Sequence, residues 1–333
     1  MRFVQRGLTL LAWSALAACA QAQTVAGEVD EQVVDRLEQL AGGPHAGARA
    51  THAKGLLADA VFEPSPEAAA ISRAAHFQPG SYSVLARFSD NGGVPTIPDA
   101  HPGAQPQGLS LRFQLPGGGV TDLLMLTSFR FPVSNRTDFL AFLTALAASG
   151  PGAAHPTAIE QFVGQHPETQ RFLADLPPPP RSYSTAQYFA IHAFKFTNAK
   201  GESRFGRYRL LPVGGVEKMD PARLAGAAPD YLADALKAQL AAGPVRFRLM
   251  LQLAEAGDDV TNCTELWPEG RRQVELGTLT VKSVFADGAQ RQKRLAYNPM
   301  LLTDGIESSG DPLLQQRSVN YPVSVSRRIA SGE

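Results

Sequence analysis

The sequence predicts an α+β fold whose main element is an antiparallel β-barrel, and three observations support this. Residues 109–115 and residues 245–253 alternate apolar and polar side chains, which is the pattern of a strand with one buried and one wet face. Segments with helical spacing of apolar residues stand between the expected strands and after them. Many expected antiparallel strands, with helices gathered between and after them, imply an α+β barrel.

The other elements follow from the same two periodicities and from turn residues. A helix is expected at Val29–Leu40, followed by a Gly/Pro/Ala loop at residues 41–48. Further strands are expected at Tyr82–Ser89, Asp122–Thr127, Tyr188–Thr197, Arg204–Leu211 and Val274–Phe285. Further helices are expected at Thr137–Ala148, Ala158–Gly164, Thr169–Leu176, Tyr231–Ala241 and in the segment that carries Tyr321. Gly117–Gly119 is expected to form a hairpin turn, and the four prolines at 177–180 a stiff connector within one domain.

Length and charge indicate one soluble, enzyme-sized domain. The chain has 333 residues, of which 44% are hydrophobic, and 31 basic residues balance 31 acidic ones. A chain of this size can bury a large core. A balanced charge creates no field that would attract nucleic acid or anionic membranes, so we expect neither as a partner.

The first 22 residues are expected to be an export signal. Arg2 and Arg6 are basic, residues 8–18 form an apolar run too short to span a bilayer as a stable anchor, and small residues follow. Cleavage after this region would release a periplasmic protein. The residues around Cys19 also resemble a lipobox, in which Cys19 would carry a lipid anchor. Both outcomes stay open.

Residues 23–44 are expected to form an N-terminal helical arm and residues 45–333 a single domain. If Cys19 is removed or acylated, Cys263 is the one cysteine left in the sequence, so no intramolecular disulfide can form. No basic residue stands next to Cys263. Cys263 is therefore expected to be a buried thiol and not a nucleophile.

The C-terminal helix places an unusual set of side chains on one face. Arg317, Tyr321 and Arg328 are spaced by four and seven residues, so in a helix the phenol would lie between two guanidiniums. Two adjacent cations favour the phenolate form of tyrosine, which can ligate a metal. A surface helix with solvated basic residues has the same pattern, and this stretch alone does not decide between the two.

Further motifs along the chain point to one family. These are Arg49-Ala-Thr-His-Ala-Lys-Gly55, Arg87-Phe-Ser89 and segments that begin at Gln107, Tyr188 and Val260. Together with Arg317-x-x-x-Tyr321-Pro, and in this order, they resemble the motifs of haem catalases over about residues 45–328. The resemblance implies a catalase-like antiparallel β-barrel, with haem between the barrel and a C-terminal helix that carries the haem-ligand Tyr.

The resemblance also implies a role for each site residue. Tyr321 would bind the ferric iron of haem b, and Arg317 would hold the phenolate oxygen ionised. His52 would move a proton between the two peroxide oxygens, and Ser89 would orient its imidazole. The expected partners of the haem propionates are Arg49, Arg87 and Arg328.

Two positions depart from the catalase pattern. Thr127 stands where catalases carry a distal Asn, and its hydroxyl is shorter and offers fewer donors. Thr51 replaces an apolar Val, and its hydroxyl is expected to hydrogen-bond the His52 imidazole, as in the catalase-like allene oxide synthases. Both changes disfavour disproportionation of hydrogen peroxide. The segments with which large catalases build tetramers are not expected here, so we expect a monomer or homodimer.

The sequence therefore predicts an exported haem peroxidase that reduces organic hydroperoxides and, more weakly, hydrogen peroxide, for antioxidant defence in the cell envelope. Its electron donor is not identified. Three alternatives stay open: a compact catalase, a hydroperoxide isomerase and a haem-binding protein without turnover. The presence of His52 favours an enzyme, because a carrier needs no distal base. The remaining histidines show no metal-ligand spacing, and His192 is expected to be structural.

Overall fold

The computed structural model describes residues 29–332, so the export signal expected at residues 1–22 lies outside the described residues. The strands are β1 (Gly55–Pro64), β2 (Tyr82–Ser89), β3 (Gly108–Gln114), β4 (Val120–Leu126), β5 (Tyr188–Phe189), β6 (Phe194–Thr197), β7 (Ser203–Pro212), β8 (Val245–Leu253), β9 (Gln273–Val284) and β10 (Ile306–Ser308). Eight of them form a closed antiparallel barrel in the order β1-β2-β3-β4-β5-β7-β8-β9, and β9 pairs with β1 to close it. Strands β6 and β10 extend the sheet beside β7. The expected α+β fold with an antiparallel barrel is confirmed.

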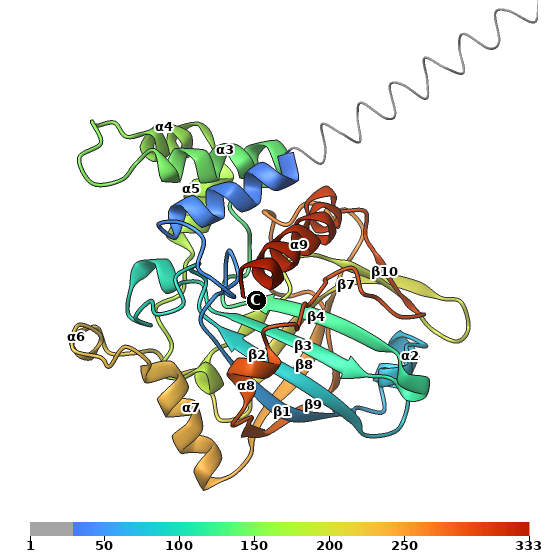
Figure 1. The fold of residues 1–333 in the computed structure, drawn as a ribbon. Coiled ribbons are helices and arrows are strands. Elements are labelled where there is room, and N and C mark those ends of the chain that lie inside the picture. Colours follow the sequence, from blue (N-terminus) through green and yellow to red (C-terminus); the bar gives the residue numbers. More distant parts are fainter. Residues whose placement is uncertain (1–28, 333) are drawn as a thin grey trace, which may run out of the picture.

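Helices lie on several sides of the barrel (Figure 1). They are α2 (Ala68–Ile71), α3 (Arg136–Ala147), α4 (Ala158–Gln165), α5 (Pro167–Ala174), α6 (Pro221–Leu224), α7 (Tyr231–Ala242), α8 (Gly288–Arg291) and α9 (Pro312–Ser331), and residues 29–40 are also helical. Helices α3, α4 and α5 are grouped with residues 29–40, whose Val33 and Leu37 pack against Phe142 and Phe162. Within residues 29–332, none of the helices is both long and apolar enough to cross a membrane.

The strands differ from the expected ones in two places. The expected strand Tyr188–Thr197 is interrupted between β5 and β6 by buried, non-strand residues, although both strands pair with β7. Strand β1 was not expected. Its inward positions include Ala58 and Ala60, and alanine has low strand propensity and a weak apolar contrast with its neighbours, so the alternation is hard to detect.

The turn between β3 and β4 has the expected hairpin form. Gly117 and Gly118 have φ angles of 83° and 89°, in the left-handed region that glycine adopts without a steric penalty. The Leu115 N–H donates to the Gly119 carbonyl at 2.8 Å across this turn. The turn therefore fixes the register of the hairpin, in which Gly108 at the start of β3 pairs with Leu126 at the end of β4.

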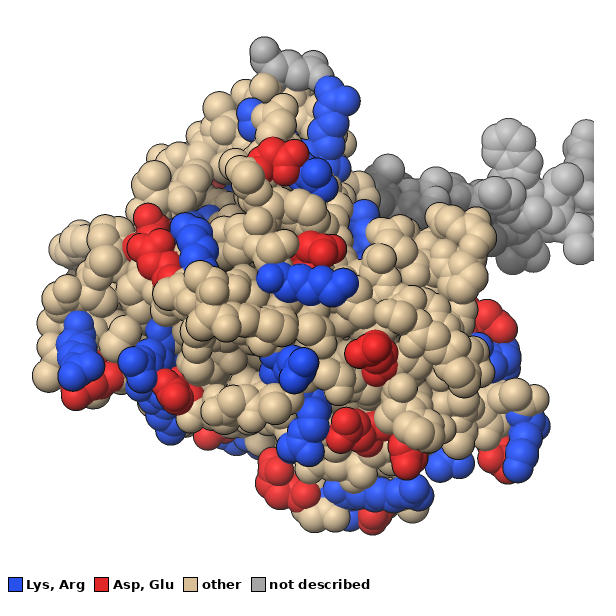
Figure 2. Space-filling model, turned by 90° about the horizontal axis from the view of Figure 1, so that it is seen from below, with Lys and Arg blue, Asp and Glu red and all other residues tan. Residues whose placement is uncertain are grey.

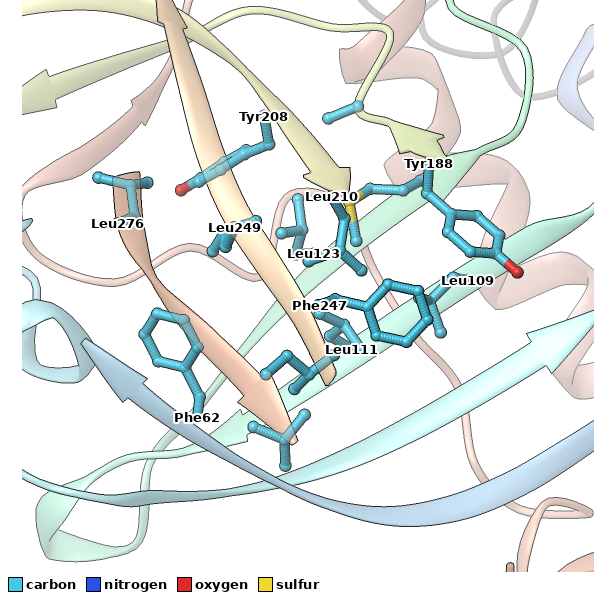
Figure 3. Packing of buried hydrophobic residues seen from close by; sticks show 14 of the residues in the cluster. Phe62, Leu109, Leu111, Leu123, Tyr188, Tyr208, Leu210, Phe247, Leu249 and Leu276 are labelled. Atoms are coloured by element: carbon cyan, nitrogen blue, oxygen red, sulfur yellow. The ribbon is translucent and has the colours of Figure 1, made fainter. Parts of the chain in front are cut away.

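Apolar side chains from the strands fill the barrel (Figure 3). Phe62, Leu109 and Phe247 are fully buried, and the ring of Phe62 meets that of Phe113 edge to face with centroids 5.4 Å apart. Each such side chain stabilises the fold by about 1.5–3 kcal/mol relative to an exposed one. On the surface face in Figure 2, basic and acidic side chains are interspersed. That face has no large patch of a single sign.

A histidine is also part of this core. His76 is 3% exposed, its ring lies 4.7 Å from that of Phe113, and its Nδ1 has no hydrogen-bond partner within the described chain. Burial lowers its pKa to about 3. The folded protein therefore holds this imidazole neutral at pH values where the unfolded chain would protonate it.

We expect this core histidine to make the protein acid-labile. Because the unfolded state binds the proton that folded His76 does not accept, stability is lost as the pH falls from about 6.5 toward 3, by on the order of 5 kcal/mol. His76→Phe should therefore flatten the pH dependence of the free energy of unfolding, measured in urea between pH 7 and pH 4.5. Substitution of the exposed His155 by Gln serves as the control. Equal slopes for wild type and His76→Phe would contradict the prediction.

Candidate active site

His52 lies just before β1 in a strained backbone conformation. Its φ of 54° is in the left-handed region, which is uncommon for a residue other than glycine. The loop after β2 holds this conformation, because the His52 N–H donates to the Asn91 carbonyl at 2.7 Å and the Ala53 N–H to the Gly92 carbonyl at 3.0 Å. Such strain persists where surrounding contacts fix the backbone, and it is often found at functional sites.

Two strands of the barrel position the His52 imidazole. Its Nδ1 lies 3.1 Å from Ser89 Oγ at the end of β2. A Cβ added to Gly108 in β3 would lie 3.0 Å from the same ring, so glycine leaves the space that the imidazole occupies. Burial, and then the positive charges of Arg87 and Arg317, lower the pKa of His52 to about 3. The imidazole is therefore neutral at physiological pH and able to accept a proton.

Three arginines from different parts of the chain converge on the segment after α8. Arg49 Nη2 and Arg328 Nη2 donate to the Leu295 carbonyl at 2.6 and 3.1 Å, and Arg87 Nε donates to Gln292 Oε1 at 2.7 Å. Within residues 29–332, none of the three has a carboxylate at ion-pair distance, and Arg328 Nε is buried without a partner. Desolvation lowers the pKa of all three, to about 10 for Arg87, and for Arg49 and Arg87 the repulsion from neighbouring arginines adds to this effect. Buried cations without anions are costly, so this cluster fits a ligand with carboxylates.

Helix α9 carries the phenol that was expected to ligate a metal. Arg317 Nη2 donates to the Tyr321 hydroxyl oxygen at 2.8 Å, as the four-residue spacing predicts. Arg328 does not flank the phenol as expected and instead donates to the Leu295 carbonyl. The reason is distance along the axis, since seven residues of helix separate two Cα atoms by roughly 10 Å.

The two threonines that depart from the catalase pattern both bond to backbone. The Thr51 hydroxyl donates to the Asn91 carbonyl at 2.6 Å, so the expected hydrogen bond to the His52 imidazole is not formed. Nδ1 of the His52 imidazole is already paired with Ser89 Oγ. Thr127 follows β4, is 5% exposed, and accepts a hydrogen bond from the Gln107 N–H at 3.1 Å.

One buried pair near α9 was not identified from the sequence. Asp311 caps this helix by accepting from the Leu313 N–H at 2.9 Å, and its other oxygen lies 2.7 Å from His192 Nδ1. Cys263 lies beside them, and burial raises the pKa of its thiol, which agrees with the expectation of an inert cysteine. The Asp-Pro dipeptide at 311 was the available signal, because both residues favour a helix start.

Replacement of Asp311 by Ala is expected to destabilise the protein by about 2–4 kcal/mol. The change removes the α9 cap, worth about 1 kcal/mol, and leaves the buried His192 without a partner, which costs about 1–3 kcal/mol. Urea unfolding measures the difference. Asp220→Ala removes the cap of the exposed helix α6 and serves as the control, for which we expect a cost of about 1 kcal/mol. Equal costs for the two variants would show that the His192 contact contributes nothing.

Comparisons with known proteins identify the family of this chain. The family model described as catalase matches residues 30–332. A catalase-related peroxidase of Synechococcus elongatus is 33% identical over 305 residues, which cover 91% of this chain and 89% of that protein. A catalase-related peroxidase of Mycolicibacterium paratuberculosis is 34% identical over 308 residues, which cover 91% of this chain and 95% of that protein.

The fold is similar to those of solved catalases. A bacterial catalase superposes with a TM-score of 0.76 at 21% identity, over 86% of this chain and 58% of that chain. A fungal catalase superposes with a TM-score of 0.74 over 86% of this chain and 60% of that chain. This chain therefore spans about three fifths of the length of these two proteins, and the likeness to them concerns the fold. With a family match over nearly the whole described chain and relatives above 30% identity, the chain belongs to the catalase family.

Proposed function

We propose that this protein is a haem-dependent peroxidase that reduces organic hydroperoxides and, more weakly, hydrogen peroxide, with electrons from a small donor. Membership of the catalase family and the two relatives named catalase-related peroxidase support a peroxide-reducing oxidoreductase. One observation carries the proposal. Ser89 Oγ positions the His52 imidazole at 3.1 Å, and Arg317, which lies close enough to lower the pKa of His52, donates to the Tyr321 hydroxyl at 2.8 Å, so a positioned base lies near the phenol of α9.

The residues present fit haem b. The cluster of Arg49, Arg87 and Arg328 would hold its two propionates, because these buried guanidiniums have no carboxylate of their own within the described chain. Tyr321 would supply the iron ligand, and Arg317 places a positive charge next to the ligating oxygen. When bound, haem supplies the redox chemistry of peroxide reduction.

The protein contributes proton transfer. Neutral His52 accepts the proton of one peroxide oxygen and returns it to the other, so that water or an alcohol leaves. Because Nδ1 is paired with Ser89 Oγ, Nε2 is the nitrogen that is free to carry this proton. Ser89 therefore acts by holding the ring in one orientation.

Thr127 supports the preference for a peroxidase over a catalase. Disproportionation requires that a second peroxide is held beside His52 while it gives up two electrons, whereas a peroxidase donor can deliver its electrons at the edge of the haem. The Thr127 hydroxyl is buried, accepts from the Gln107 N–H, and directs its one donor toward Gln107 Oε1 at 3.5 Å, whereas an asparagine would offer two amide donors to that second peroxide. The backbone bond of Thr51 removes the observation that favoured a hydroperoxide isomerase.

We expect that oxidation of a reducing donor with an organic hydroperoxide is faster than oxygen release from hydrogen peroxide. Both rates are measured on one haem-loaded preparation, with an oxygen electrode and with a chromogenic donor. Thr127→Asn should raise oxygen release by about tenfold, the effect of one added hydrogen bond of about 1.4 kcal/mol in the transition state. Oxygen release by the wild type that exceeds donor oxidation would show that the protein is a compact catalase.

We further propose that residues 1–22 direct export and that the protein acts in the cell envelope as a monomer or homodimer, possessing a lipid anchor if Cys19 is acylated. The basic, apolar and small-residue order of this segment supports export. Fractionation of expressing cells and the intact mass of the mature protein test this. Recovery of the full-length chain in the cytoplasm would contradict export, and the mass distinguishes simple cleavage from acylation.

A further inference from the structure

We infer that Gln292 is a positioning residue of the cofactor site, whose neutral amide fixes the Arg87 guanidinium for a carboxylate of the ligand without cancelling its charge. The inference rests on the proposed haem site and goes beyond it. Gln292 lies outside the catalase motifs of the sequence, and its role at Arg87 concerns the carboxylates of the ligand.

The Gln292 side chain links two strands of the barrel through Arg87. Its Oε1 accepts from Arg87 Nε at 2.7 Å, and its Nε2 donates to the carbonyl of Gly55, the first residue of β1, at 3.2 Å. The guanidinium lies directly against that backbone, since a Cβ on Gly55 would lie 2.3 Å from Arg87 Nη2. Arg87 Nη2 also donates to the His52 carbonyl at 2.8 Å.

These contacts leave one edge of Arg87 for a ligand. Its Nε and Nη2 are both occupied, whereas Nη1 makes no hydrogen bond to any residue that the structure describes. The guanidinium is therefore held in one orientation with a donor to spare. Preorganisation of this kind lowers the entropic cost of binding an anion.

The backbone of the same segment orients the other two arginines. Arg49 Nη2 donates to the Gln292 carbonyl at 3.2 Å and to the Leu295 carbonyl at 2.6 Å, and Arg328 Nη2 donates to the Leu295 carbonyl. An amide and two carbonyls are neutral acceptors. They fix the positions of three cations while the net positive charge of the cluster remains available.

A second arginine of the barrel, which is partly buried, shows the alternative. Arg112 in β3 forms a bidentate ion pair with Asp122 in β4, with Nε to Oδ1 and Nη2 to Oδ2 both at 2.7 Å. Asp122 raises the pKa of Arg112, whereas desolvation lowers that of Arg87. Arg112, which is structural, thus has the carboxylate of Asp122 as its partner. Arg87, whose charge faces the proposed cofactor site, has the amide of Gln292.

The test replaces the amide with its isosteric acid. Gln292→Glu would pair with Arg87 and compete with the carboxylates of the ligand. We expect a higher Tm of the haem-free protein and an affinity for haem that falls by about tenfold or more. Gln292→Met removes the hydrogen bonds without adding a charge, so it should lower the Tm and weaken haem binding less than Gln292→Glu does. Both affinities come from absorbance titrations of the haem-free chain.

Haem dimethyl ester separates charge from shape. It lacks the free carboxylates, so Gln292→Glu should leave its affinity unchanged while that for haem falls. Equal losses for haem and ester, or no loss in Gln292→Glu, would overturn the inference. A wild-type protein that binds haem no better than an unrelated control protein would instead overturn the proposed function, and with it this inference.

Discussion

Replacement of Tyr321 by Phe is expected to lower the affinity of the protein for haem by more than about 100-fold. The phenol oxygen is the proposed iron ligand, and loss of outer-shell partners alone costs about 10–100-fold in metal affinity. The variant also leaves the Arg317 guanidinium without its acceptor at 2.8 Å. Titration of the haem-free variant, followed by the haem absorption bands, measures the effect.

Tyr297→Phe is the matched control for this experiment. Tyr297 is buried close to Arg49 and Arg87, and its hydroxyl donates to the Leu85 carbonyl at 3.1 Å. Its loss costs a backbone hydrogen bond but removes no proposed ligand, so haem affinity and the absorption spectrum should persist. A Tyr321→Phe protein with the wild-type spectrum would exclude Tyr321 as the ligand.

Elements with a clear periodicity were predictable from the sequence, and those without it were not. The alternation in residues 245–253 predicts β8 with its bounds, because inward and outward positions differ strongly in polarity. Strand β1 contains alanines at its inward positions and became a strand through its pairing with β2 and β9 on either side. Such pairing is a tertiary effect that local propensity does not report.

In the candidate site, too, local contacts were predictable from the sequence and long-range contacts were not. Arg317 and Tyr321 are one helical turn apart, so their contact followed from spacing. Gln292 reaches Arg87 across 205 positions, and Asp311 reaches His192 across 119, so neither contact has a local pattern. The predicted hydrogen bond from the Thr51 hydroxyl to the His52 imidazole was wrong, because being adjacent in sequence does not fix the side-chain torsion of Thr51. The Asn91 carbonyl that it binds comes from the loop after β2.

His52→Ala is expected to retain haem but to slow peroxide cleavage by at least about 100-fold, the usual contribution of a general acid–base group. The rate is the change in haem absorbance after rapid mixing with an organic hydroperoxide. His52→Asn is a second variant, because asparagine tolerates the left-handed backbone at this position better than alanine does. His52→Asn therefore removes the base with less risk to the fold, and both variants should cleave peroxide slowly.

The pH dependence distinguishes a proton carrier from a residue that only shapes the pocket. A base with a pKa of about 3 is fully neutral above about pH 5, so protonation of His52 should not slow the wild type between pH 5 and pH 8. His45→Ala, in the loop before the site, is a control that should match the wild type.

Ser89→Ala leaves Nδ1 of His52 unpaired and should slow peroxide cleavage by about 10-fold, which is less than the effect of losing the imidazole. If His52→Ala and His52→Asn cleaved peroxide at the wild-type rate, proton transfer would have to come from solvent, and the strained backbone at His52 would have no catalytic explanation.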